Sequence, residues 1–167
     1  AEAARTIYAQ LGNHKQALQI VERQLGHTAA AAERLPLLRE LGSLRAQMGD
    51  PSGQAAALEE VIRLVPEDYA AMRELAAAYL ARAEMPDAGG PENAMRAAAL
   101  LVTIAQGLGG EHEVAFAEAA LDAWGGDETA YAIVSEAYRA SGRDGELVLR
   151  QINFLTANPA SPQANVL

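Results

Sequence analysis

Apolar residues recur along this chain at the spacing of an amphipathic helix. Met72, Leu75, Ala76 and Tyr79 stand at positions i, i+3, i+4 and i+7, which places all four on one helical face. Similar stripes, separated by residues that favour turns, follow one another over most of the sequence. The pattern predicts an all-α chain of about nine helices. The predicted helices cover residues 1–11, 14–25, 32–48, 52–65, 68–84, 92–107, 111–124, 128–141 and 145–157.

Glycine and proline punctuate these helices at a fixed distance. Gly49 precedes Pro66 by 17 residues, and Gly142 precedes Pro159 by the same 17 residues. Glycine permits a sharp turn between two helices, whereas proline is excluded from a helix interior and tolerated in a first turn or a connection. Each stretch therefore predicts the second helix of a helical hairpin, closed by its proline.

The first helix of each hairpin carries the same four-position stripe. A small third residue, such as Ala76 or Ser135, indicates a point where a neighbouring helix crosses closely. Arg45 stands where the last apolar residue of one set is expected. The further sets are Tyr131, Val134, Ser135 and Tyr138; Ala98, Leu101, Val102 and Ala105; and the incomplete set Leu38, Leu41 and Gly42.

With its hairpins, four-position stripe, turn glycine and closing proline, the sequence resembles the tetratricopeptide repeat family. Two stretches match the 34-residue unit of that family, residues 35–68 and 128–161. The residues in register are Leu38, Leu41, Gly42, Gly49, Leu58 and Pro66 in the first stretch, and Tyr131, Val134, Ser135, Tyr138, Gly142 and Pro159 in the second. The resemblance implies a right-handed α-solenoid of helical hairpins, with a concave groove in which partner peptides bind.

The resemblance divides the chain into a helical repeat domain, residues 1–158, and a tail. The tail, residues 159–167, has no amphipathic pattern, so we expect a linker or a disordered end. The chain opens without an initiator Met and without a cap for its first helix, so we also expect it to be a fragment of a longer protein. The repeat domain comprises a partial unit at 1–31, a unit at 32–68, an irregular part at 69–127 and a unit at 128–158.

The irregular part allows two pairings of its helices. Helix 92–107 packs either against helix 68–84 or against helix 111–124. The Gly-Leu-Gly-Gly turn at 107–110 follows a complete apolar stripe, which favours a hairpin formed by 92–107 and 111–124.

Composition excludes several classes of function. The chain has 13 basic and 22 acidic residues, a net charge of −9, so it repels nucleic acid phosphates and we expect no nucleic acid partner. No apolar run reaches the roughly 18 to 20 residues that cross a bilayer, so we expect a soluble chain without membrane insertion. Without Cys the compartment, cytoplasmic or periplasmic, stays open. The abundance of Ala, and of Arg over Lys, is typical of a high-GC bacterial source.

Residues suited to catalysis or metal binding are scattered. His14, His27 and His112 fall in a turn, a connection and a helix start, and none belongs to a metal-binding motif. Adjacent helical residues point about 100° apart, so Glu111, His112 and Glu113 do not converge on a metal ion. The sequence therefore predicts no enzyme, no metal site and no cofactor.

Arginines supply the strongest candidate site. Arg39 and Arg73 lie 34 residues apart, each one residue beyond the first apolar position of its helix. The resemblance implies that this position faces the concave groove, to which Ser43 and Arg96 contribute neighbouring positions. Because arginine captures carboxylates with two parallel hydrogen bonds, we expect a protein or peptide partner with acidic side chains or a C-terminal carboxylate.

Two alternatives stay open. In the first, Arg39 and Arg73 would pair with acidic residues of their own or a neighbouring helix and be structural. In the second, the module would be a spacer or an assembly segment of a larger protein, with self-association through its own surfaces.

Overall fold

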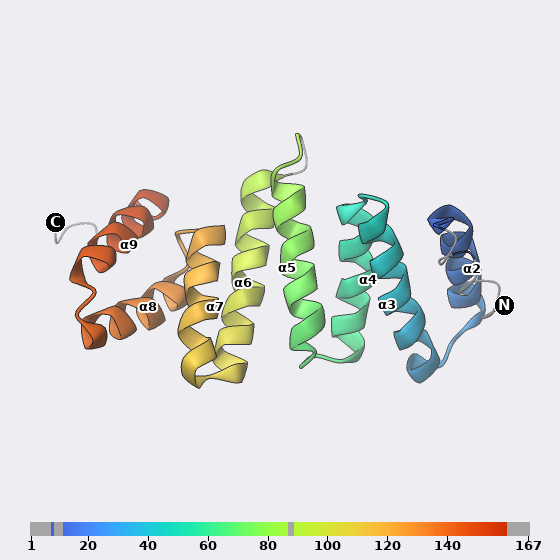
Figure 1. Ribbon diagram of the computed structural model, residues 1–167, viewed down its shortest axis with the longest axis horizontal. Coiled ribbons are helices and arrows are strands. Elements are labelled where there is room, and N and C mark those ends of the chain that lie inside the picture. Colours follow the sequence, from blue (N-terminus) through green and yellow to red (C-terminus); the bar gives the residue numbers. More distant parts are fainter. Residues whose placement is uncertain (1–7, 9–11, 87–88, 160–167) are drawn as a thin grey trace. The chain divides into compact units, whose positions relative to one another are not determined.

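The computed structural model describes residues 8, 12–86 and 89–159. This part of the chain contains α-helices and no strand, as predicted. Each predicted helix from residue 14 onward has an observed counterpart (Figure 1). The helices are α2 (His14–His27), α3 (Ala31–Gln47), α4 (Pro51–Leu64), α5 (Tyr69–Ala83), α6 (Gly90–Leu108), α7 (Gly110–Ala123), α8 (Glu128–Ser141) and α9 (Asp144–Ala157). Apart from Tyr8, which is helical, the predicted helix 1–11 lies outside the described residues, and so does the tail beyond Pro159.

Aspartates begin three of the helices. Asp50, Asp68 and Asp127 precede α4, α5 and α8, and each carboxylate accepts a hydrogen bond from the backbone N–H three residues further on, at 2.8, 3.1 and 2.9 Å. These bonds satisfy amides that have no partner within the first helical turn. The aspartates therefore fix where each helix starts.

The predicted turn glycines take the backbone conformation that needs glycine. Gly49 has a φ of +69° between α3 and α4, and Gly142 has a φ of +70° between α8 and α9. A side chain at such a φ is strained, so these glycines permit the tight reversal that returns the second helix along the first.

The chain divides into two compact units, residues 1–81 and 82–167. In the first unit α3 packs against α2 and α4. In the second unit α6 packs against α7, α7 against α8, and α8 against α9. The prediction that helices 92–107 and 111–124 form a hairpin is therefore confirmed by the packing of α6 on α7 (Figure 1).

Small residues let the helices of the first unit approach closely. Gly42 of α3 is buried, and a Cβ atom there would lie 3.5 Å from the Cγ atom of Leu58 in α4. Leu58 is itself only 2% exposed, so α3 and α4 meet at this point. Gly42 is the small residue of its stripe, and it occupies the close crossing that such a residue indicates.

Aromatic stacking joins the last two helices of the second unit. The rings of Tyr131 in α8 and Phe154 in α9 lie 4.4 Å apart between centroids and 14° from parallel. Within α9, which is described throughout, Phe154 is the buried residue. This stacked pair therefore supplies the buried apolar contact between α8 and α9.

Candidate interaction surface

Arg39, the first of the predicted groove arginines, forms an ion pair with Asp68. The Arg39 side chain is 47% exposed, whereas that of Asp68 is 9% exposed and also caps α5. Arg39 of α3 thus holds the carboxylate that starts α5. This is the structural pairing with a neighbouring acid that the sequence left open as an alternative.

The other predicted residues, Ser43, Arg73 and Arg96, are exposed. Ser43 accepts a 3.4 Å hydrogen bond from the amide nitrogen of Gln47, one turn further along α3. Arg73 projects from α5 and makes no hydrogen bond or ion pair within the described part of the chain. Arg96 belongs to the second unit, where it pairs with Glu92 at 2.7 Å. Of the three arginines, Arg73 has the guanidinium best placed to take a partner's carboxylate.

A glutamate at one helix position ties successive helices together. The helices α2, α4 and α7 are each 14 residues long, and the ninth residue of each is a glutamate. We call Glu22, Glu59 and Glu118 the joint glutamates. Each accepts a hydrogen bond from the following helix, from a residue that stands at the last position of the four-position stripe. The donors are Arg45 to Glu22 at 2.5 Å, Tyr79 to Glu59 at 2.5 Å, and Tyr138 to Glu118 at 2.7 Å.

This joint explains why Arg45 interrupts its apolar stripe. Arg45 stands where α5 and α8 have a tyrosine, and it reaches Glu22 of α2 as those tyrosines reach their glutamates. A second hydrogen bond, 2.7 Å long, joins Arg45 to Asp50 in the turn before α4. One guanidinium therefore connects α2, α3 and the start of α4.

The environment of Asp50 lowers the pKa of its carboxyl group. The hydrogen bond from the backbone N–H of Gly53 is the largest cause, and the hydrogen bond and charge of Arg45 add to it against the opposing effect of burial. Both contacts favour the ionised carboxylate.

Stability of the first unit is expected to fall in acid because of Asp50. Its folded-state pKa is depressed, so its contribution is fully present above the ordinary aspartate pKa of about 4 and disappears as the pH drops through the lower folded-state value. Asp50→Asn keeps a helix cap but loses this titration. Urea unfolding between about pH 7 and pH 3 should therefore show a shallower acid decline for Asp50→Asn than for the wild type. The same exchange at exposed Asp144 is the control, and an unchanged pH profile for Asp50→Asn would contradict the assignment.

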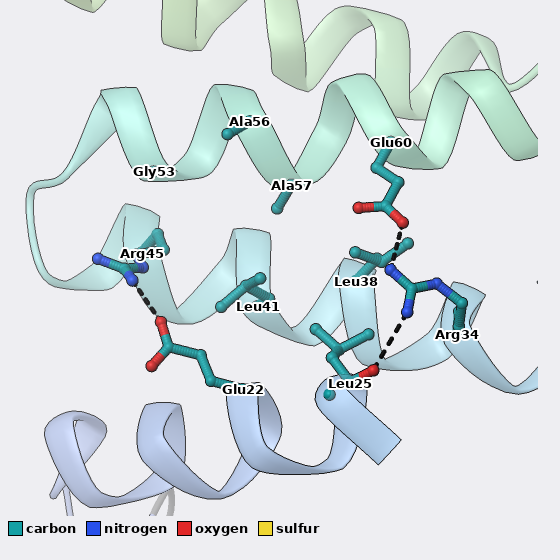
Figure 2. Close-up of a pocket in the computed structure, with 11 residues that line it drawn as sticks. Glu22, Leu25, Arg34, Leu38, Leu41, Arg45, Gly53, Ala56, Ala57 and Glu60 are labelled. Atoms are coloured by element: carbon teal, nitrogen blue, oxygen red, sulfur yellow. Dashed lines mark hydrogen bonds and ion pairs between the residues drawn. The ribbon is translucent and has the colours of Figure 1, made fainter. Parts of the chain in front are cut away.

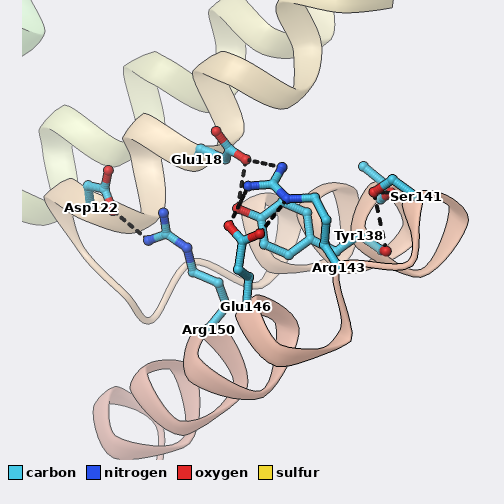
Figure 3. Close-up of polar contacts among 8 residues, drawn as sticks. Glu118, Asp122, Tyr138, Ser141, Arg143, Glu146 and Arg150 are labelled. Carbon is cyan, nitrogen blue, oxygen red and sulfur yellow. Dashed lines mark hydrogen bonds and ion pairs between the residues drawn. The ribbon is translucent and has the colours of Figure 1, made fainter.

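A polar cluster surrounds the joint of the second unit (Figure 3). The guanidinium of Arg143 lies 3.9 Å from the centroid of the Tyr138 ring and binds both carboxylate oxygens of Glu146, at 2.8 and 2.5 Å. The hydrogen bonds from Arg143 lower the pKa of Glu146. Arg143 also reaches Glu118 at 3.2 Å, so the charges of the cluster neutralise one another and join α7, α8 and α9.

The first unit contains a groove of about 490 Å³ between α2, α3 and α4 (Figure 2). We call it the α3 groove, because α3 forms its floor. It is lined by Glu22, Leu25, Gly26, Arg34, Leu38, Leu41, Arg45, Gly53, Ala56, Ala57 and Glu60. Leucine and alanine side chains form the middle of the groove, and charged side chains stand at its two ends. Such a combination of apolar floor and polar edges is typical of a binding site.

Ion pairs across the helices hold both ends of the α3 groove in place. At one end Arg45 binds Glu22. At the other end Arg34 binds Glu60 of α4 and donates hydrogen bonds of 3.1 and 3.0 Å to the carbonyl oxygens of Leu25 and Thr28. These carbonyls end α2, so Arg34 also caps that helix. Ion pairs therefore join α3, the floor of the groove, to α2 at one end and to α4 at the other.

The α3 groove uses a different set of α3 residues from the predicted arginine site. Arg34, Leu38, Leu41 and Arg45 follow one another at i, i+4, i+7 and i+11, which places them on one face of the helix. Arg39 and Ser43 do not line the groove. This groove was not predicted from the sequence, although the spacing of the two outer arginines around the leucines was a signal for it.

Comparison with known proteins places the chain in no family. No family model matches it, and no curated protein matches it. Among the described residues no three histidine, aspartate or glutamate side chains lie together as metal ligands. In the same part of the chain, each helix is too short or too polar to cross a membrane.

Proposed function

We propose that this chain is a non-catalytic, tetratricopeptide-like helical repeat module, with the right-handed course of that family, that binds a partner protein or peptide. Successive packed helices with repeated turn glycines and joint glutamates support the repeat architecture. The observation that carries the binding function is the α3 groove, whose walls stand apart over an apolar floor.

The dimensions of the α3 groove suit apolar side chains of a partner segment. Its volume of about 490 Å³ falls within the range of roughly 300 to 1,000 Å³ typical of ligand pockets. Leu25 and Leu41, both half-buried, offer apolar surface to a leucine, methionine or phenylalanine of the partner. Because ion pairs already fix the walls, binding costs this module little ordering entropy.

Acidic groups of the partner have a separate point of attachment at Arg73. Arg73 is exposed on α5, and within the described part of the chain it has no acidic partner. A partner's carboxylate could therefore pair with it without displacing an internal acid. Arg39 and Arg96 already hold acids of their own chain, so they contribute less to such capture. Selection for acidic side chains or a C-terminal carboxylate therefore rests mainly on Arg73.

Selection of random peptides displayed on phage tests the proposal. Ala56 is exposed and lines the α3 groove, so Ala56→Lys places a long side chain over the groove without disturbing the core. Ala46→Lys makes the same exchange at an exposed position of α3 outside the groove, and it serves as the matched control. We expect the enriched peptides to share an apolar residue and to bind Ala56→Lys at least about tenfold more weakly by calorimetry, a loss of about 1.4 kcal/mol.

Two outcomes would overturn the proposal. Equal affinity of the enriched peptides for wild type, Ala56→Lys and Ala46→Lys would mean that they bind elsewhere. A selection that enriches no peptide sequence would show that the module is not a peptide binder. If acidic peptides alone bind Arg73→Glu about tenfold more weakly than the wild type, Arg73 also contacts a carboxylate of the peptide.

A further inference from the structure

The outward face of α9 leaves a stripe of apolar side chains in water. Val148, Leu149 and Ile152 are 53%, 63% and 50% exposed. Their spacing places them together on the side of α9 away from buried Phe154, and half-buried Leu155 continues the stripe. A single exposed leucine is ordinary on a protein surface, but a contiguous apolar face marks a contact site.

The same face is built differently on the earlier helices. Like α2, α4 and α7, the helix α9 is 14 residues long, but its ninth residue is Ile152 instead of a joint glutamate. On α4 and α7 that glutamate accepts a hydrogen bond from the hydroxyl group of a tyrosine on the next helix. Ile152 accepts no hydrogen bond, so a helix bearing the same tyrosine would leave its hydroxyl without this partner. The surface that α9 fits must therefore be apolar at this point.

Charge is nearly absent from this face of an otherwise acidic protein. Between Leu147 and Ala157 the sequence has one charged residue, Arg150, and no acidic residue. Arg150 is held by Asp122 of α7 in an ion pair. Because each copy carries a net charge of −9, two copies repel one another. The acidic residues of α9, Asp144 and Glu146, lie in its first turn, so from Leu147 onward two copies can approach without opposing acidic groups.

We propose that α9 of one copy packs against α9 of a second copy, with the apolar stripes facing each other across a two-fold axis. An isologous contact requires one patch to complement itself, which an apolar stripe with little charge does. Three half-exposed side chains bury far less than the roughly 800 Å² per partner of a standard stable complex. The dimer is therefore weak, with a dissociation constant between about 10 µM and 1 mM.

Sedimentation of the whole chain measures this association. The mass of the wild type should rise from monomer toward dimer between about 10 µM and 1 mM. Ile152→Glu should remain monomeric, with an association constant reduced at least about tenfold. Met95→Glu is the matched control, since Met95 is 45% exposed on α6 and its exchange adds the same charge. Ile152 is half exposed, so the variant is expected to fold, and circular dichroism verifies its helicity.

Cysteine cross-linking locates the contact. The chain has no cysteine, so Ile152→Cys introduces a single thiol. If the two α9 helices face each other, mild oxidation should give a covalent dimer at least about tenfold faster than it does for Met95→Cys.

Three results would overturn the proposal. A wild type that stays monomeric up to about 1 mM would show that no second copy binds. Equal weakening by Ile152→Glu and Met95→Glu would place any association elsewhere. The chain's own tail would be the occupant if the Val148 and Ile152 methyl groups were shielded from solvent in a monomer and became accessible when residues 160–167 are removed.

Discussion

Replacement of Phe154 by alanine is expected to lower the free energy of unfolding of the second unit by about 3–5 kcal/mol. Phe154 is 1% exposed, stacks on Tyr131 and is the buried residue of α9. A 14-residue helix is marginal in water on its own, so α9 depends on this contact for its order. Urea unfolding followed by circular dichroism measures the loss, and hydrogen exchange should show that the α9 amides lose protection.

Leu149→Ala is the control for this truncation. It removes a similar apolar side chain from the same helix, but from a position that is 63% exposed. Measured at a concentration low enough to keep the chain monomeric, it should change the unfolding free energy by less than about 0.5 kcal/mol. If Phe154→Ala were as mild as Leu149→Ala, the stacked pair would not hold α9 in place.

Replacement of Asp68 by alanine is expected to cost about 2 kcal/mol, because Asp68 has two functions. It caps α5 through a 3.1 Å hydrogen bond, and it binds Arg39 of α3. Loss of a cap alone costs about 1 kcal/mol, and the exposed half of the ion pair limits the second contribution to about 1 kcal/mol. Urea unfolding of the variant measures the sum.

Asp127→Ala separates the two contributions. Asp127 caps α8 with a 2.9 Å hydrogen bond, and no ion pair to it occurs among the described residues. We therefore expect a loss of about 1 kcal/mol for Asp127→Ala. In the Arg39→Met background Asp68→Ala should become equally mild. Equal losses for Asp68→Ala and Asp127→Ala in the wild type would show that the Arg39 ion pair contributes nothing, which would leave Arg39 free to bind a partner.

Local signals made the helices and turns predictable. Gly49 and Gly142 predicted their turns correctly, because glycine adopts a positive φ without strain. The hairpin of α6 and α7 followed from a complete apolar stripe and the glycines after it. Such features depend on neighbours within a few residues, which the sequence displays directly.

The contacts between helices were harder to predict from the sequence. Arg39 was placed in a groove by family resemblance, but its partner Asp68 lies 29 residues further along the chain. Arg45 interrupts its apolar stripe in the sequence, and only the structure shows that it binds Glu22 of the preceding helix. Which arginine binds an internal acid, and which faces a partner, depends on how three helices dock, and the apolar pattern alone does not encode those pairings.

Glutamate at the ninth helix position was the signal that the sequence did contain. Glu59 and Glu118 each precede by 20 residues the tyrosine that donates to them. A search for this Glu-to-Tyr spacing predicts the joints at Glu59 and Glu118 without a structure, but it misses the joint at Glu22, whose donor Arg45 lies 23 residues further along the chain. It also distinguishes α9, where Ile152 takes the place of the glutamate.

The most direct test of the proposed binding site is to map an enriched peptide onto the labelled chain by nuclear magnetic resonance. We expect the largest amide shifts on titration to come from the lining of the α3 groove, including Leu25, Leu41 and Ala56. Shifts confined to the surface around Ser43 and Arg73, or spread over the second unit, would contradict the assignment of the groove as the binding site.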